Sequence, residues 1–289
     1  MTVPTARPTP KRTMQVRRVR FTHPEGSLRR HYVVGEDGEG DLVMSHVVAV
    51  LSATFPPGED FFIRSVQHYS DRITDPELKR QVKVFIGQEV VHGREHDALN
   101  QALRKMGYPT HWVDAFVKRT MALSTRFLPP RVALGHTAAL EHYTATLAEC
   151  LLTDPRAQAL LGESKVRDIL LWHALEEAEH KAVAFDVYRA VGGSERMRRR
   201  TMIEASVGLF TVTILFTLLS LLTDPATYNP RRLLRSLRAL RHSPFLTPEI
   251  RTRIRAYHHP TFHPDNHNTT QTLTTWRTHL FPPTTPTHP

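Results

Sequence analysis

Cysteine is almost absent from this sequence of 289 residues, in which Cys150 is the only one. A single thiol excludes an intrachain disulfide framework and any metal site built from several thiolates, and it fits a reducing compartment. The first twenty residues lack both a long apolar run and a small-residue cleavage site, so no secretory signal is predicted and a cytoplasmic location is expected. Strand-like alternation never persists along the chain, so the predicted fold class is all-α.

The net charge of +10 is unevenly distributed. Residues 59–191 hold 17 basic and 18 acidic residues, whereas residues 192–289 hold 13 arginines against 5 acidic residues. Basic flanks suit an anionic membrane surface or an acidic partner as well as nucleic acid. Because no nucleic-acid-binding motif accompanies the charge, no nucleic-acid partner is expected.

Helix start and stop signals divide residues 41–193 into four long helices. The signals are Asp41, Asp75-Pro76, Gly107, Pro129-Pro130, Asp154-Pro155, Ser164 and Gly192-Gly193. The connection between the second and third helices, about residues 108–128, is longer than the others. Four helices with one long crossover are typical of a ferritin-like four-helix bundle, which is the predicted architecture.

The flanking segments differ in composition from this bundle. Residues 1–40 are rich in Pro, Arg and Gly and are interpreted as an N-terminal arm, and residues 194–257 as a C-terminal helical extension. Residues 258–289 contain 10 Thr, 6 Pro and 6 His, so most of this tail is predicted to be disordered or draped over the surface. Its histidines lack the carboxylates and the spacing that a metal site needs.

Residues 205–222 form an uncharged, largely apolar segment between two arginine clusters. As a helix it would span about 27 Å, slightly less than a bilayer core of about 30 Å. Three interpretations stay open: a helix buried against the bundle, a helix in or on a membrane, and a dimer interface. Membrane association would favour an apolar substrate.

Two Glu-x-x-His pairs carry the chemistry of the predicted bundle. The pairs are Glu89/His92 and Glu177/His180. Residues three apart share one face of a helix, so each pair can present a carboxylate and an imidazole to one metal. A di-metal bundle also needs one Glu from each of the other two helices, and Glu59 and Glu141 are available.

The two predicted hairpins support this assignment by their lengths. Glu59 and Glu89 each lie 15 residues from a turn near residue 74, and Glu141 and Glu177 each lie 18 residues from a turn near residue 159. Both antiparallel hairpins therefore bring their glutamates to the same height. Glu59 is the weakest candidate, because Pro56-Pro57-Gly58 is expected to break the chain just before it.

Further candidates surround these six residues. His173 lies one turn before Glu177 and is a predicted seventh ligand, whereas His96 is expected to support a ligand from behind. Glu95 and Glu176 are candidate catalytic bases. Glu179 and Asp186 are candidate hydrogen-bond partners of the ligands. His142 and Cys150 are expected to be structural.

Four stretches resemble the bacterial family of predicted metal-dependent hydrolases. They are FPPGE at 55–59, QEVVHGREH at 88–96, WHALEEAEHK at 172–181 and YHHPTFHP at 257–264. The order Glu, Glu-x-x-His, Glu, His-x-x-x-Glu-x-x-His is also similar to that of the di-iron arylamine N-oxygenases, such as p-aminobenzoate N-oxygenase. That second resemblance implies Glu59, Glu89, His92, Glu141, His173, Glu177 and His180 as ligands.

The preferred prediction is a non-haem di-iron oxygenase that hydroxylates, N-oxygenates or desaturates a small organic substrate. Ligation by Glu and His without thiolate suits two Fe ions, with Mn or Zn as alternatives. Such an enzyme would use O₂ and electrons from a reductase or ferredoxin, because no dinucleotide-binding fingerprint is evident. The alternatives are a two-metal hydrolase of an ester, amide or phosphate, and a non-catalytic iron-binding protein. A membrane surface or a homodimer is the further expected partner.

Overall fold

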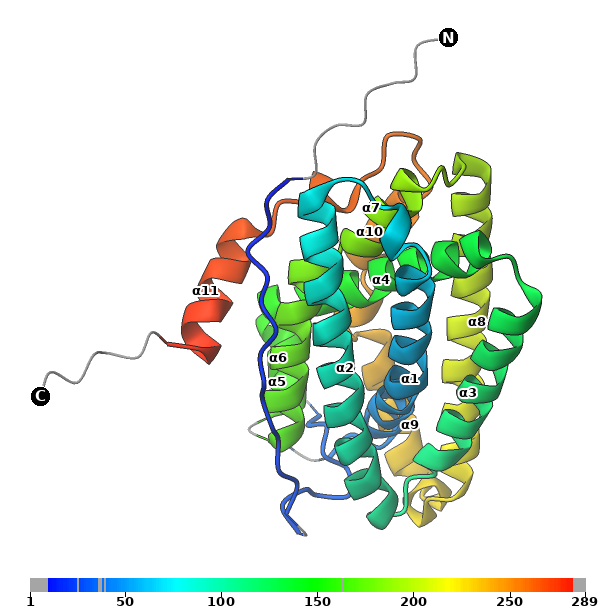
Figure 1. Cartoon of the computed structure of the whole chain (residues 1–289). Coiled ribbons are helices and arrows are strands. Elements are labelled where there is room, and N and C mark those ends of the chain that lie inside the picture. The colour runs from blue at the N-terminus through cyan, green and yellow to red at the C-terminus, as the bar shows by residue number, and fades with distance from the viewer. Residues whose placement is uncertain (1–9, 25, 36–37, 39, 163, 283–289) are drawn as a thin grey trace, which may run out of the picture.

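The structure is a computed structural model that describes residues 10–24, 26–35, 38, 40–162 and 164–282. Within these residues the protein is all-α, as the sequence predicts, and its only β feature is an isolated bridge between Val34 and Gly40. The helices pack with their long axes roughly aligned, and the N-terminal arm runs along their outside (Figure 1).

Four long helices surround the buried polar centre: α1 (Leu42–Gln67), α2 (Pro76–Lys105), α4 (Pro130–Thr153) and α6 (Lys165–His180). All four begin where the sequence predicts, and three of them carry a side-chain cap. The side chains of Asp41, Asp75 and Ser164 each accept a hydrogen bond from a backbone N–H in the first turn. Such caps satisfy N–H groups that have no partner within the helix, and this fixes the starting points.

The long connection predicted at residues 108–128 contains a helix, α3 (Thr110–Phe127), which was not itself predicted. Val113 and Val117 lie four residues apart on one side of α3 and pack against Val50 and Ala53 of α1. Burial against α1 supplies the stabilisation that the local sequence lacks.

The predicted fourth helix is interrupted directly after His180. It continues as α7 (Val183–Ala190), and a short α5 (Pro155–Leu161) precedes it. The tail at 258–289 is likewise more ordered than expected, since it forms a 3₁₀ turn (Pro264–Asn266) and α11 (Thr270–Leu280). Arg277 of α11 donates to the buried carboxylate of Glu179, which holds the tail on the surface. Residues 283–289 lie outside the described part.

The C-terminal extension contributes α8 (Glu195–Leu222), α9 (Pro230–Arg241) and α10 (Pro248–Ala256). Shorter 3₁₀ turns span Ser70–Arg72, Pro225–Tyr228 and Pro244–Leu246. In the described chain, α8 alone is long and apolar enough to cross a membrane, and 28% of its most apolar stretch is buried. The interpretation of a helix buried against the bundle therefore holds for one face of α8 only.

Candidate metal centre

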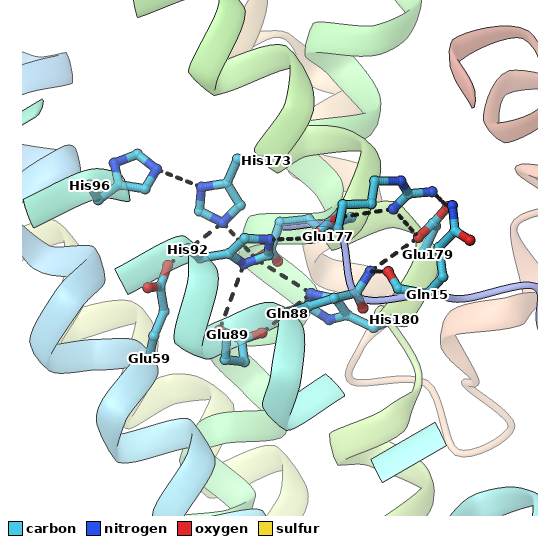
Figure 2. Close-up of polar contacts among 12 residues, drawn as sticks. Gln15, Glu59, Gln88, Glu89, His92, His96, His173, Glu177, Glu179 and His180 are labelled. Carbon is cyan, nitrogen blue, oxygen red and sulfur yellow. Dashed lines mark hydrogen bonds and ion pairs between the residues drawn. The ribbon is translucent and has the colours of Figure 1, made fainter. Parts of the chain in front are cut away.

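The structure brings the seven predicted ligands together at the middle of the four long helices. The contributions are Glu59 from α1, Glu89 and His92 from α2, Glu141 from α4, and His173, Glu177 and His180 from α6. None of the seven is more than 4% exposed. In Figure 2 Glu59, Glu89, His92 and Glu177 turn toward a shared interior space.

The ligand atoms form two overlapping groups. Glu89, His92, Glu177 and His180 can offer one atom each within 4.8 Å of one another, and so can Glu59, His92 and His173. Glu141 belongs to neither group, but it contacts the first one through a hydrogen bond of 3.0 Å between its Oε2 and His180 Nδ1. Ligands at right angles around one ion, each bound at about 2.1 Å, are separated by about 3 Å. The 3.2 Å between His180 Nε2 and Glu89 Oε1 is close to this separation, whereas the 3.8 Å between His92 Nδ1 and Glu177 Oε1 corresponds to a wider angle between the two ligands.

Many of these buried atoms have no hydrogen-bond partner within the described chain. Eight atoms of the cluster are in this state: both carboxylate oxygens of Glu59 and of Glu89, Glu141 Oε1, Glu177 Oε2, His92 Nδ1 and His180 Nε2. A buried polar atom without a partner costs about 1–3 kcal/mol, and a charged one costs more. Such a concentration at one point is explained by a cation that binds these atoms, so the residues fit a metal centre.

The pKa values agree with a centre that needs positive charge. Burial raises the pKa of Glu89 and of Glu59 well above the usual range, and neighbouring carboxylates raise it further. Burial also raises the pKa of Glu141 to about 7. The pKa of His92 lies well below its ordinary value, first because of burial and then because His173 and His180 are close. Without a cation the carboxylates repel one another, and the imidazole of His92 is held neutral with a lone pair free.

A chain of hydrogen bonds fixes the orientation of His173. Asn100 Nδ2 donates to the backbone oxygen of Ser52, and the Ser52 hydroxyl donates to Asn100 Oδ1. The Ser52 hydroxyl must then accept from His96 Nδ1, which is 2.9 Å away. His96 Nε2 in turn accepts from His173 Nδ1 at 2.7 Å.

In a neutral His173 ring this order of donors leaves Nε2 without a proton, and that atom lies 2.9 Å from Glu177 Oε1 and 3.7 Å from Glu59 Oε1. A nitrogen lone pair and a carboxylate oxygen at 2.9 Å need a proton or a cation between them. Burial lowers the pKa of His96 well below its ordinary value, which is consistent with a neutral ring in the chain. Hydrogen bonds to the far nitrogen of a ligating imidazole select its tautomer and hold its plane. His96 therefore hydrogen-bonds to His173 on the side away from Glu59, and it contributes no atom to the two ligand groups.

His92 is oriented by a residue of the N-terminal arm. His92 Nε2 lies 3.0 Å from Glu176 Oε2, and Glu176 accepts at 2.9 Å from the buried guanidinium of Arg17. Since Nε2 carries the proton toward Glu176, the Nδ1 lone pair faces the centre. Burial raises the pKa of Glu176 to about 7, and Arg17 opposes this. Arg17 was not anticipated, because the sequence alone does not show where the arm lies.

The expectation that the two prolines break the chain before Glu59 is wrong. Helix α1 continues through Pro56 and Pro57 and carries Glu59 into the centre. A proline inside a helix removes an N–H and frees the carbonyl four residues earlier. For Pro56 that carbonyl belongs to Ser52, and Asn100 Nδ2 donates to it at 3.0 Å. A side chain from α2 thus replaces the missing backbone donor.

The remaining predicted residues lie outside the two ligand groups. Glu95 accepts from the backbone N–H of Phe21 and from Arg94, so its carboxylate faces the arm. Glu176 supports His92 rather than standing free beside the centre. Glu179 accepts from Arg17 and Gln88. Asp186 pairs with Arg12 and His263 near the surface, away from the ligands.

Aromatic rings enclose the imidazoles of the centre. Trp172 lies 4.9 Å from the His92 ring, Phe85 lies 5.0 Å from His180, and Phe55 lies 4.7 Å from His173, all between centroids. His142 Nε2 donates a hydrogen bond to the backbone carbonyl oxygen of Arg253 at 2.9 Å, which is consistent with a structural role. Cys150 is buried in an apolar cluster. The centre is therefore separated from water by packed side chains.

A family model described as "predicted metal-dependent hydrolase" matches residues 15–268. The match covers most of the arm, all four long helices and the whole C-terminal extension. Neither the curated proteins nor the solved structures include a significant match to this chain.

Proposed function

We propose, on the premise that the chain belongs to the family of predicted metal-dependent hydrolases, that its buried centre holds two divalent metal ions and hydrolyses an ester, amide or phosphate. The observation that carries the proposal is the set of eight buried ligand atoms that have no partner in the described chain. The family favours hydrolysis over the oxygenase that the ligand order alone suggested.

Charge balance supports two ions rather than one. Glu59, Glu89, Glu141 and Glu177 carry four negative charges when ionised, and two divalent ions neutralise them. The two ligand groups overlap at His92, which fits two adjacent positions. Glu and His ligands without thiolate suit Fe, Mn or Zn.

Residues of this chain would divide the work of such a centre. A pair of bound divalent ions would lower the pKa of a water molecule and polarise the group to be cleaved. Glu176 and Arg17 hold His92, while His96 and Ser52 hold His173. Such support keeps the lone pairs aimed at the centre before any substrate arrives.

A second candidate, oxidation of an organic substrate by O₂ at two Fe ions, is supported by burial. All seven ligands are at most 4% exposed, and aromatic rings surround them. A site closed to water protects reactive oxidation chemistry from side reactions. This function would need an external electron donor, whereas hydrolysis needs none.

One set of assays separates the two functions. The full chain is stripped with a chelator, reloaded anaerobically with Zn²⁺, Mn²⁺ or Fe²⁺, and its metal content is measured. It is then tested on p-nitrophenyl esters, anilides and phosphate esters without O₂. We expect about two metals per chain and turnover that is absent in Glu89→Gln and intact in Glu77→Gln, a half-buried glutamate in the first turn of the same helix that pairs with Arg80.

Two other results of these assays would change the proposal. Two metals without hydrolysis, but with O₂ consumption by the Fe²⁺ form in the presence of a reductant, would replace the hydrolase by the oxygenase. Metal-free protein under all loading conditions would refute the centre itself.

A further inference from the structure

One side of the molecule, formed by α3 and α8, exposes apolar side chains along its length. On α8 these are Ile203, Val207, Phe210, Ile214, Leu218 and Leu222, each at least half exposed. On α3 they are Trp112, Phe116, Leu123 and Phe127, which are 42% to 70% exposed. The two helices run beside each other (Figure 1), and the rings of Phe116 and Phe216 are 5.2 Å apart. This surface is called the α3/α8 face below.

The apolar side chains of α8 follow a single stripe. Successive members are three or four residues apart, which keeps them on one side of a helix. From Ile203 to Leu222 the stripe extends over about 28 Å, at 1.5 Å per residue. Soluble monomers rarely leave so large an apolar surface in water, so the α3/α8 face requires a partner.

The opposite side of α8 is held by the protein core. Met202 and Ala205 near its start belong to the main hydrophobic cluster, and Leu221 near its end packs with Leu42 and Val43 of α1. Crossing a bilayer would require α8 to leave these contacts. A helix anchored in this way can lie in the plane of a membrane surface instead.

Exposed cations lie at both ends of the stripe. Arg196 and Arg200 precede Ile203 at the same helical spacing, so they continue the stripe toward the start of α8. At the other end, α9 packs against Leu221 through Leu233 and Leu240, and its Arg231, Arg238 and Arg241 are exposed.

The two acidic side chains of α8 are already engaged, because Glu204 pairs with Arg200 and His136, and Glu195 pairs with Arg198. Helix α3 carries one acidic residue, the half-buried Asp114. On α3, Lys118 and Arg119 add two more exposed cations. The α3/α8 face is thus an apolar band bordered by positive charge.

We propose that the α3/α8 face docks the protein on a lipid bilayer that carries anionic headgroups. The apolar stripe would enter the boundary of the acyl chains, and the arginines at its ends would meet the headgroups. A second copy of the chain fits less well. Pairing two such faces in either direction places the arginines at the start of α8 against other arginines, and like charges oppose association.

Flotation with vesicles tests this docking. The full-length chain is mixed with phosphatidylcholine vesicles or with vesicles that contain 30% phosphatidylglycerol, and floated through a density gradient. We expect flotation with the anionic vesicles, and we expect it to decrease with added salt. Each arginine near an anionic surface strengthens binding about fivefold, so Arg231→Gln with Arg238→Gln should weaken it roughly 25-fold.

The apolar contribution is tested with Phe210→Glu combined with Ile214→Glu, which should abolish flotation. The matched controls are Val90→Glu, at a 55% exposed valine on α2, and Lys79→Gln with Lys105→Gln, two exposed lysines of the same helix. Neither control should change binding by more than about twofold. Circular dichroism and metal content verify that each variant is folded.

Trp112 provides an independent measurement. It is 42% exposed on α3, so its fluorescence should shift to shorter wavelength and be quenched by brominated lipid when the face docks. Vesicle binding that survives Phe210→Glu with Ile214→Glu would overturn the proposal. A dimer that does not bind vesicles, and that the same variant dissociates, would assign the face to a second copy. A monomer that binds no vesicles would also overturn it.

Discussion

The replacement Glu89→Gln should have opposite effects on stability with and without metal. Both carboxylate oxygens of Glu89 are buried without a hydrogen-bond partner, and the residue is fully inaccessible to solvent. His180 Nε2 is 3.2 Å from Glu89 Oε1, but the two atoms do not form a hydrogen bond. Gln keeps the size of the side chain and removes its charge, so packing changes little.

The direction follows from the pKa of Glu89, which burial and then Glu141 and Glu177 raise well above 4.5. A carboxyl group whose pKa is raised on folding lowers stability as the pH rises above its unfolded value. A buried polar group without a partner costs about 1–3 kcal/mol. We therefore expect metal-free Glu89→Gln to be more stable than the metal-free parent by about 1–3 kcal/mol at pH 7, and we expect the gain to vanish near pH 4.5.

Metal should reverse this order. An ion present at a thousandfold excess over its dissociation constant stabilises the folded state by about 4 kcal/mol. For a chain of this size, that corresponds to a rise in Tm of roughly 8–16 °C per ion. The parent protein should show this rise and Glu89→Gln should lose most of it.

Thermal unfolding of both proteins with chelator or with Mn²⁺ measures the effect, together with metal analysis of the same samples. Glu77→Gln is the control, because Glu77 lies on the same helix and pairs with Arg80 at the surface. That control should lower stability by at most about 1 kcal/mol and respond to metal as the parent does. If metal-free Glu89→Gln were less stable than the parent, Glu89 would belong to a hydrogen-bonded structural network and the metal centre would be wrong.

Three further predictions concern the surroundings of the centre. Asn100→Ala should weaken metal binding by about 10- to 100-fold in a competition with a chromophoric chelator, because Ser52 and His96 lose their orientation; unchanged affinity would contradict the hydrogen-bond chain. Arg17→Gln should weaken binding through Glu176 in the same assay, and an effect on stability alone would limit Arg17 to a structural role. Burial lowers the pKa of His142 to about 4, so its contribution to stability should be lost as the pH falls from 6.5 to 4. The difference in unfolding free energy between the parent and His142→Gln should change by about 3 kcal/mol over that range, and a flat difference would refute the assignment.

The sequence predicted those features that depend on local chemistry. Capping by Asp41, Asp75 and Ser164 marked helix starts, because a short polar side chain must satisfy backbone N–H groups there. The Glu-x-x-His spacing predicted that each Glu and His share one helix face, because three residues nearly complete one helical turn, and the structure places both pairs in one buried group. Features that depend on distant contacts could not be predicted in this way. Helix α3 is stabilised by burial against α1. Arg17 contacts Glu176, which is 159 residues away in the sequence, because the arm packs along the outside of the helices.

The exposed side of α8 shows the same limit. An apolar helix in a soluble core and one on a membrane surface have nearly the same composition, so the sequence left both interpretations open. The structure shows which side chains are covered: Met202 and Leu221 are, whereas Val207 and Ile214 are not. Composition determines how apolar a helix is, whereas packing determines which of its apolar side chains remain exposed.

The proline pair in α1 connects the fold to the chemistry most directly. Pro56 removes one helical hydrogen bond and frees the carbonyl of Ser52 at the height of the metal centre. Asn100 occupies that carbonyl with its amide N–H and uses its amide oxygen to orient the Ser52 hydroxyl, which in turn sets the tautomers of His96 and His173. With a residue other than proline at position 56, its backbone N–H would donate to the Ser52 carbonyl. Asn100 would then lose one of its two hydrogen bonds to Ser52. A motif that the sequence presents as a break in the helix is therefore part of the support of a ligand.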